Sequence, residues 1–394
     1  MKHAGLRWFL IAAAIVLNGL PLLWPVPRSA FGEGRGERGG GRAGEASASM
    51  PPSGSVPSFS EELINPGSPL HMSHVASICE LSDGRLAAVW YAGSREGARD
   101  VAICFATQER GQSFWTTPRA ILTPEQAGRV LGRAVRKVGN PLIFSDAAGK
   151  LWMLYVTINI GGWSGSSLNL TTSTDGGVSW TPGRRLTLSP FFNVSELVRN
   201  RPAPLSDGNW LVPIYHECLG KFPELLWLRD TADGVSATKT RITGGRSGFQ
   251  PAMAVLGTNA ALAFLRDCGP RKRIAVTRTD DAGQTWASPE AADLPNPDSG
   301  LTALCLADGR LLLAFNDSAA GRENLRLAVS EDEGRSWRRA ATLAEESGAE
   351  FSYPYLLQTC DGTVHLVYTW KRKGIKHVAF NAAWLNTRPA QPSR

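Results

Sequence analysis

The sequence predicts an all-β protein, a six-bladed β-propeller of four-stranded antiparallel blades. Three observations lead to this prediction. Six β-type runs each end in a tight polar turn, these turns recur about every fifty residues, and several units also carry a second turn that ends in Trp. Paired strands repeated at such a period are typical of a propeller.

The first turn series marks where the first two strands of each unit meet. Its members begin 63, 61, 50, 51 and 53 residues apart. Asp accepts backbone N–H bonds in such turns, and Gly permits a positive φ. The series comprises Asp83-Gly84, Asp146 to Gly149, Asp207-Gly208, Gly257 to Asn259, Asp308-Gly309 and Asp361-Gly362.

The second turn series is expected to join the third and fourth strands. Its Trp is predicted to pack the base of the hairpin between neighbouring sheets, so the series serves the scaffold. The copies are STDGGVSW (173–180), TDDAGQTW (279–286) and SEDEGRSW (330–337), with a looser TQERGQSFW (107–115) and a worn RDTADGVSA (229–237).

Strand patterns fill the units between the turns. The fifth unit contains LTALCLA (301–307), RLLLAFN (310–316), NLRLAVS (324–330) and WRRAATLA (337–344), and the first unit repeats this order. The last unit lacks one strand, which FSEELI (59–64) is expected to supply as a clasp that closes the ring. No helical pattern of convincing length competes with these strands.

The chain is predicted to have three parts. Residues 1–27 combine a basic start with an apolar stretch at 8–24, which favours a signal peptide; an uncleaved membrane anchor is the alternative. Residues 28–58 are rich in Gly, Ser, Pro and Arg, which predicts a disordered linker. Residues 59–394 form the propeller, which is expected to be exported to the periplasm or secreted.

Composition limits the classes of partner and cofactor. The net charge of +7 suits an acidic glycan, and no nucleic-acid-binding module accompanies it. The six cysteines are scattered without a C-x-x-C pair. His71 and His74 would point to opposite faces of a strand, so neither a metal site nor a cofactor is expected.

Strand parity predicts which face carries the function. Both turn series lie on one face, so the opposite face collects the starts of first strands and the loops between second and third strands. That face is rich in arginine and carboxylate side chains. Its candidate functional residues are His74, Arg95, Glu96, Asp100, Arg201, Glu217, Arg266, Asn316, Arg322 and Tyr353.

These features resemble the sialidase (neuraminidase)-like family, whose Asp-box turns are also called bacterial neuraminidase repeats. The likeness runs from about residue 60 to the C-terminus and is carried by the turns above and by HVASICELSDGRLAAVWYAGSREGARDVAI, NRPAPLSDG, LPNPDSGLTALCLADGRLLLAFNDS and SYPYLLQTCDGTVHLVYT. The resemblance implies an exo-α-sialidase-like glycoside hydrolase that removes a terminal acidic sugar with retention of configuration.

The resemblance also implies roles for individual residues. The family order Glu, Arg, Arg, Tyr matches Glu217, Arg266, Arg322 and Tyr353, with Tyr353 as nucleophile and Glu217 as its activating base. The remaining roles fall to Asp100 or Glu96 as the acid, Arg95 or Arg201 as a third arginine, and His74 and Asn316 as substrate contacts.

Alternatives remain for the function and for single residues. This chain lacks the Arg-Ile-Pro motif that the family usually carries near the first blade. A glycan-binding propeller without turnover would keep the arginines, and a polysaccharide lyase would use Tyr353 or His216 to abstract a proton beside a uronic carboxylate. Arg266 and Arg322 could instead pair with their sequence neighbours Asp267 and Glu323.

Overall fold

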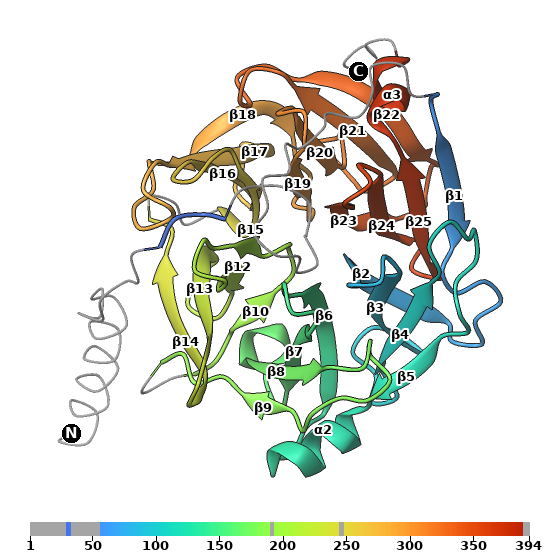
Figure 1. Cartoon of the computed structure of the whole chain (residues 1–394), viewed down its shortest axis with the longest axis vertical. Coiled ribbons are helices and arrows are strands. Elements are labelled where there is room, and N and C mark those ends of the chain that lie inside the picture. The colour runs from blue at the N-terminus through green and yellow to red at the C-terminus, as the bar shows by residue number, and fades with distance from the viewer. Residues whose placement is uncertain (1–28, 33–55, 190–192, 244–247, 389–394) are drawn as a thin grey trace.

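The computed structural model describes residues 29–32, 56–189, 193–243 and 248–388. Within them, six antiparallel sheets form a ring around a central axis, which confirms the six-bladed propeller (Figure 1). The predicted leader (1–27) lies outside the described residues. No helix in the described part of the chain is long and apolar enough to cross a bilayer.

Each blade runs from an inner to an outer strand. From the inside outward, the strands are β2 (Met72–Glu80), β3 (Leu86–Gly93), β4 (Ala102–Gln108) and β5 (Arg119–Leu122) in blade one; β6 (Lys137–Ser145), β7 (Leu151–Ile158), β8 (Ser166–Ser173) and β9 (Arg184–Arg185) in blade two; β10 (Leu197–Val198) and β11 (Ala203–Pro204), then β12 (Trp210–His216), β13 (Phe222–Thr231) and β14 (Gly234–Arg241) in blade three. The other three blades comprise β15 (Gly248–Val255), β16 (Ala261–Asp267), β17 (Arg273–Thr279) and β18 (Glu290–Pro295) in blade four; β19 (Thr302–Cys305), β20 (Leu311–Phe315), β21 (Asn324–Ser330) and β22 (Arg338–Glu345) in blade five; and β23 (Phe351–Gln358), β24 (Val364–Trp370), β25 (Gly374–Phe380) and β1 (Phe59–Leu63) in blade six.

The core lies between neighbouring blades. Strands β3 and β7 are buried along their whole length because the two neighbouring blades cover the two faces of each blade. Their sequences are accordingly almost continuously apolar. The largest of the buried side chains, Trp90, Trp152 and Trp227, fill the space between sheets.

The Trp of the blade-five Asp-box packs between neighbouring blades, as predicted. In blade five, Asp332 Oδ1 accepts the Ser336 N–H at 2.8 Å, and the Trp337 indole donates to the Gly334 carbonyl at 3.0 Å. The Trp337 ring then packs edge-on against Phe264 of blade four. The 229–237 segment differs from the prediction: it forms a two-residue hairpin between β13 and β14 and no Asp-box.

Strand β1 closes the ring as the sequence predicts. It pairs antiparallel with β25, so the first described strand of the propeller completes the last blade (Figure 1). Phe59 at its start stacks on Trp384 of helix α3 (Ala382–Asn386), with 4.7 Å between ring centroids. This pairing covers the outer edge of blade six.

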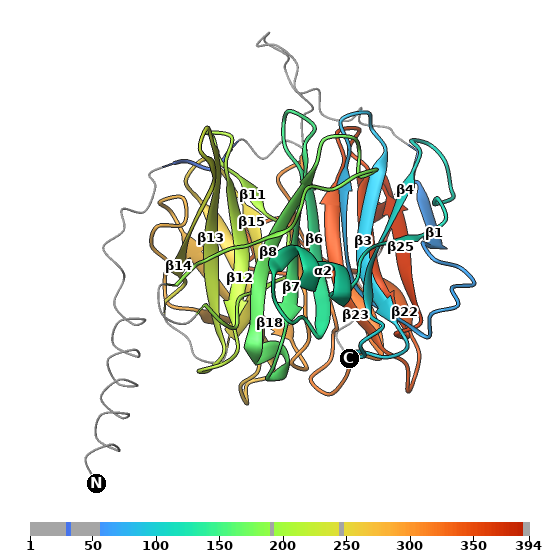
Figure 2. The same cartoon turned by 90° about the horizontal axis from the view of Figure 1, so that it is seen from below.

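The sequence analysis missed two short helices, α3 and α2 (Pro124–Leu131). Helix α2 lies on the outer wall of the propeller (Figure 2). Thr123 and Gln126 form a capping box, and Gly132 ends the helix with a φ of 61°. The sequence TPEQ carries this start signal, but eight residues are too few to show a helical period clearly.

Residues 29–32 pack on the propeller rather than forming part of a free linker. Phe31 is fully buried against blades three and four. Its N–H donates to the Thr258 carbonyl at 2.7 Å, and Gly32 N–H donates to the Pro204 carbonyl at 2.9 Å. A single aromatic residue therefore holds this part of the predicted linker against the face that carries the tight turns.

Candidate functional site

A β-bulge recurs at the start of the inner strand in four blades. The strand register shifts between His74 and Ser77, between Gly139 and Leu142, between Phe249 and Ala252, and between Ser352 and Tyr355. A bulge kinks its strand and redirects a side chain. The residues with positive φ in these bulges are Val75, Asn140, Gln250 and Tyr353.

Tyr353 is surrounded by cationic and aromatic side chains. The Arg199 guanidinium lies 5.0 Å and the Arg322 guanidinium 5.5 Å from the centre of its ring. His74 contacts the ring edge-on at 4.9 Å. Tyr353 is half-buried, and no hydrogen bond joins its hydroxyl to another described residue. These contacts hold the Tyr353 ring in place, and its hydroxyl group is left without a hydrogen-bond partner among the described residues.

Arg266 and Arg322 are both held by Asp298, which precedes β19. The Asp298 carboxylate accepts from Arg266 Nε at 2.7 Å, and its main-chain carbonyl accepts from Arg322 Nη2 at 3.0 Å. Burial would lower the pKa of Arg266, but the electrostatic influence of Tyr353 and Asp298 raises it. Arg266 therefore pairs with Asp298 rather than with its sequence neighbour Asp267. Arg322 pairs with Glu350, at 3.4 Å, rather than with its neighbour Glu323.

A charged cluster joins blades one and six beside Tyr353. Arg372 bridges the carboxylates of Glu96 and Glu350. Burial would raise the pKa of Glu350, but hydrogen bonds from Arg372 and Ser352 lower it to about 2. Burial, reinforced by the positive charge of Arg372, lowers the pKa of His74 to about 3, so this histidine is neutral. Its Nδ1 lies 3.0 Å from the Thr369 hydroxyl.

Glu217 lies on the loop after β12, on the same face. Its N–H donates to the Ser195 hydroxyl at 2.7 Å, and burial raises the pKa of its carboxyl group. The charges acting on this group are those of Lys221, Arg266 and Asp298. Among the described residues, no hydrogen bond joins Glu217 to Tyr353.

Three predicted residues occupy other environments on this face. The Asp100 carboxylate accepts two hydrogen bonds from Ser94, both at 2.9 Å, and thereby closes the β3–β4 loop. Arg95 is exposed in the same loop. Asn316 is fully buried, and its amide donates to the Phe351 carbonyl at 2.7 Å, which links blade five to blade six.

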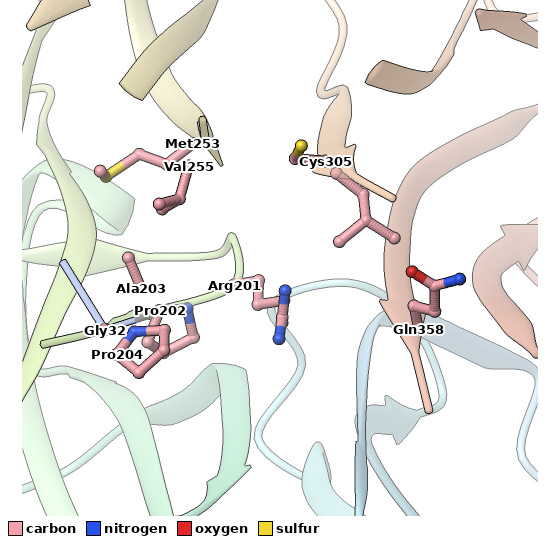
Figure 3. Close-up of a pocket in the computed structure, with 10 residues that line it drawn as sticks. Gly32, Arg201, Pro202, Ala203, Pro204, Met253, Val255, Cys305 and Gln358 are labelled. Atoms are coloured by element: carbon pink, nitrogen blue, oxygen red, sulfur yellow. The ribbon is translucent and has the colours of Figure 1, made fainter. Parts of the chain in front are cut away.

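Arg201 lies near the ends of the inner strands that are farther from Tyr353. It lines a pocket with Gly32 and with the turn-side ends of the inner strands (Figure 3). The pocket also includes Val255, Cys305 and Gln358, and Gln358 lies five residues along β23 from Tyr353. This location replaces the expectation that Arg201 contacts substrate beside Tyr353.

The sequence analysis passed over Arg199 because it lies where the inner strand of blade three is interrupted. A polar residue before proline marks the bulge in Asn140-Pro141, Gln250-Pro251 and Tyr353-Pro354, and Arg201-Pro202 fits the same pattern. In blade three, however, β10 ends at Val198 and β11 begins at Ala203, and Arg199 lies in the interruption between them. The same analysis did not select Asp298, Glu350 or Arg372 as functional residues.

The side chains gathered at the site are mainly arginines, carboxylates and one tyrosine. Among the described residues, no group of three or more His, Cys, Asp or Glu side chains could hold a metal ion. Arginines, carboxylates and one accessible phenol together suit recognition of an anionic ligand, because guanidinium groups bind carboxylates in a planar two-point geometry.

Comparisons with known proteins agree with this architecture. A family model described as the BNR repeat-like domain matches residues 84–366. No curated protein matches the sequence. Among solved structures, a Hadza microbial sialidase superposes with a TM-score of 0.66 at 18% identity, covering 79% of this chain and 66% of that one.

Two further structures extend the fold match. The leech intramolecular trans-sialidase, solved with 2,7-anhydro-Neu5Ac, has a TM-score of 0.65 at 12% identity, with 84% of this chain and 71% of that chain covered. A Dyadobacter fermentans protein of unknown function has a TM-score of 0.66 at 14% identity, with 83% and 100% covered. The family model spans most of the propeller, and this chain therefore belongs to the BNR repeat-like domain family, in a sialidase-like fold.

Proposed function

We propose that this protein is a sialidase-like glycoside hydrolase that removes a terminal acidic sugar from a glycoconjugate. The observation that carries the proposal is the position of Tyr353, whose accessible phenol lies among Arg199, Arg266 and Arg322. A tyrosine suits an anionic sugar because a carboxylate nucleophile would be repelled by the substrate's own carboxylate. Sialidases are the glycosidases that use tyrosine in this way.

In the proposed reaction, Arg266 and Arg322 hold the sugar carboxylate and Tyr353 attacks the anomeric carbon. The phenolic proton passes to Glu217, the Tyr353 oxygen forms a bond to carbon, and the bond to the leaving oxygen breaks. An acid, Asp100 or Glu96, protonates that oxygen. The deprotonated acid then takes a proton from water, and the water oxygen forms a bond to the anomeric carbon as the glycosyl-tyrosine bond breaks. Glu217 returns its proton to the released Tyr353 oxygen.

The raised pKa of Glu217 supports its role as a base. Burial disfavours its negative charge, so the carboxylate gains more from accepting a proton than an exposed glutamate would. The mechanism requires the Glu217 carboxylate to come within hydrogen-bond reach of the Tyr353 hydroxyl when substrate is bound.

A specific test is release of 4-methylumbelliferone from its α-sialoside by the full chain and by Tyr353→Phe. The variant keeps the ring and its contacts but loses the nucleophilic oxygen, so we expect kcat to fall by about a thousandfold or more. Glu217→Gln should also lower kcat. An active wild type whose Tyr353→Phe variant is equally active would refute the role of Tyr353.

The second candidate function is an acidic-glycan-binding propeller without turnover. It is favoured by the positions of the two candidate acids, because Asp100 is engaged by Ser94 and Glu96 by Arg372. Calorimetric titration with sialyllactose distinguishes the two functions. Saturable binding that Arg322→Ala abolishes, without release of sugar by the wild type, would support the binding function.

A further inference from the structure

Arg199 is a buried cation with no carboxylate partner among the described residues. Only 4% of the surface of Arg199 is exposed to solvent. Nη1 donates to Asn200 Oδ1 and to the Leu301 carbonyl, and Nη2 donates to the Pro354 carbonyl, each at 2.7 Å. All three acceptors are neutral. The Nε–H group is buried without a partner in the described structure.

Such an arrangement is costly for an arginine. Burial of a charge is normally offset by an ion pair, and buried arginines are rare without one. Arg266 and Arg326, the other two buried arginines in the described part of the chain, obey this rule. Arg266 pairs with Asp298, and Arg326 pairs with Asp317. Burial lowers the pKa of Arg199 to about 10, and the ionisable groups acting on it are Tyr353, Tyr215, Arg266 and Arg322.

Of the two tyrosines near Arg199, only Tyr353 is accessible. Tyr215 is buried, receives a hydrogen bond from Asn140 at 3.2 Å, and has a pKa raised by burial. The centre of the Tyr353 ring lies 5.0 Å from the Arg199 guanidinium, and Tyr353 is only half-buried. Arg199 has no negatively charged partner among the described residues of the resting protein. Such a negative charge can form on the Tyr353 oxygen during the reaction.

We propose that Arg199 stabilises the negative charge that develops on the Tyr353 oxygen. When the phenolic O–H bond breaks, the proton goes to Glu217 and the electron pair stays on oxygen until it forms the bond to the anomeric carbon. When water later cleaves that bond, the pair returns to the Tyr353 oxygen, again beside Arg199. This inference rests on the proposed nucleophilic role of Tyr353 and makes Arg199 a positioning residue, since it is too buried to contact the sugar.

A purely mechanical role is the competing explanation. Arg199 donates hydrogen bonds from blade three to the Leu301 carbonyl of blade five and the Pro354 carbonyl of blade six. Its loss would weaken the contacts between these blades whatever its charge does. Three variants separate charge from mechanics: Arg199→Lys keeps a cation, whereas Arg199→Gln and Arg199→Met remove it. Arg326→Gln is the matched control, because it deletes a buried arginine that is paired with Asp317.

The direct measurement is the ultraviolet absorbance of tyrosinate as the pH is raised. From the curve of each protein we subtract the curve of the same protein carrying Tyr353→Phe in addition. The difference reports the ionisation of Tyr353 alone. We expect the midpoint of this change to move upward by about one pH unit or more in Arg199→Gln or Arg199→Met, and by less in Arg199→Lys and Arg326→Gln. An unchanged midpoint in the uncharged variants, or an equal shift in Arg199→Lys, would overturn the inference.

Circular dichroism establishes which variants are folded. If neither uncharged variant folds, Arg199 serves the fold and the inference is overturned.

Kinetics provide the second readout: we expect Arg199→Met to lower kcat by about a hundredfold with little change in KM, and Arg199→Lys to restore part of the loss. A wild type without hydrolase activity would defeat the proposed function, whereas the absorbance titration would still decide the role of Arg199.

Discussion

Gly300 lies directly against Tyr353, with no room for a side chain between them. A Cβ atom on Gly300 would lie 2.9 Å from Tyr353 Cδ1 and 3.0 Å from Arg199 Cζ. Both distances are shorter than normal contacts between carbon atoms. A residue without a side chain in blade five thus sets how closely Tyr353 and Arg199 approach each other.

Gly300→Ala should therefore displace the Tyr353 ring and impair the site. We expect kcat/KM for the α-sialoside to fall by about tenfold to a hundredfold, because small displacements of a reacting group are costly. Gly257→Ala is the control, since no atom lies within 4 Å of the Cβ that it would add. Equal activity in the two variants would contradict the close packing described for Gly300.

Asn316→Ala should affect stability more than substrate binding. Its amide donates to backbone carbonyls on both sides of the blade five to blade six junction, at Asn324 and Phe351. Leaving these buried acceptors unpaired should lower the free energy of unfolding by about 1–3 kcal/mol. Urea denaturation and KM measurements check this, with Arg322→Lys expected to show the reverse pattern. A large rise in KM for a fully stable Asn316→Ala would restore its role as a substrate contact.

Phe31→Ala should destabilise the propeller although Phe31 precedes its first strand. The ring is fully buried between blades three and four, so truncation leaves a cavity or releases the segment. We expect a loss of about 3 kcal/mol in the free energy of unfolding. Val56→Ala, at a residue 82% exposed, should change it little. Identical urea midpoints for the two variants would show that the packing of Phe31 does not contribute to stability.

Acid should destabilise the fold through its buried histidines. Burial, together with the charge of His377, lowers the pKa of His365 from 6.5 to about 3. Between these pH values the unfolded chain binds a proton that the folded protein excludes, so stability is present above pH 6.5 and is lost as the pH falls toward 3. The slope is about 1.4 kcal/mol per pH unit for one such histidine.

His365→Asn should make this dependence shallower. The free energy of unfolding measured by urea across this pH range gives the slope, with His71→Asn as the control at an exposed position. His74 and His216 also have pKa values lowered by burial, so part of the acid sensitivity should persist. A His365→Asn slope equal to that of the wild type would exclude this contribution.

The repeat architecture could be predicted from the sequence because its signals are local. An Asp-Gly turn or an Asp-box uses residues within a few positions of one another, and the paired strands between turns alternate or run apolar over short windows. The same logic predicted that Arg266, Arg322 and Tyr353 lie on one face, and the structure places the Arg322 guanidinium 5.5 Å from the centre of the Tyr353 ring. It also identified β1 as the closing strand, since the last unit lacked one.

The tertiary structure decided which charges meet. Arg199 and Tyr353 lie 154 positions apart in the chain, and the closed ring brings the Arg199 guanidinium to 5.0 Å from the centre of the Tyr353 ring. Asp298 pairs with Arg266, and Glu350 pairs with Arg372. The partners of each pair come from separate segments of the chain, and no local sequence pattern predicts that these segments meet. Repeats and turns are specified by neighbouring residues, whereas a charged site depends on how six separate blades converge, and that geometry exists only in the closed ring.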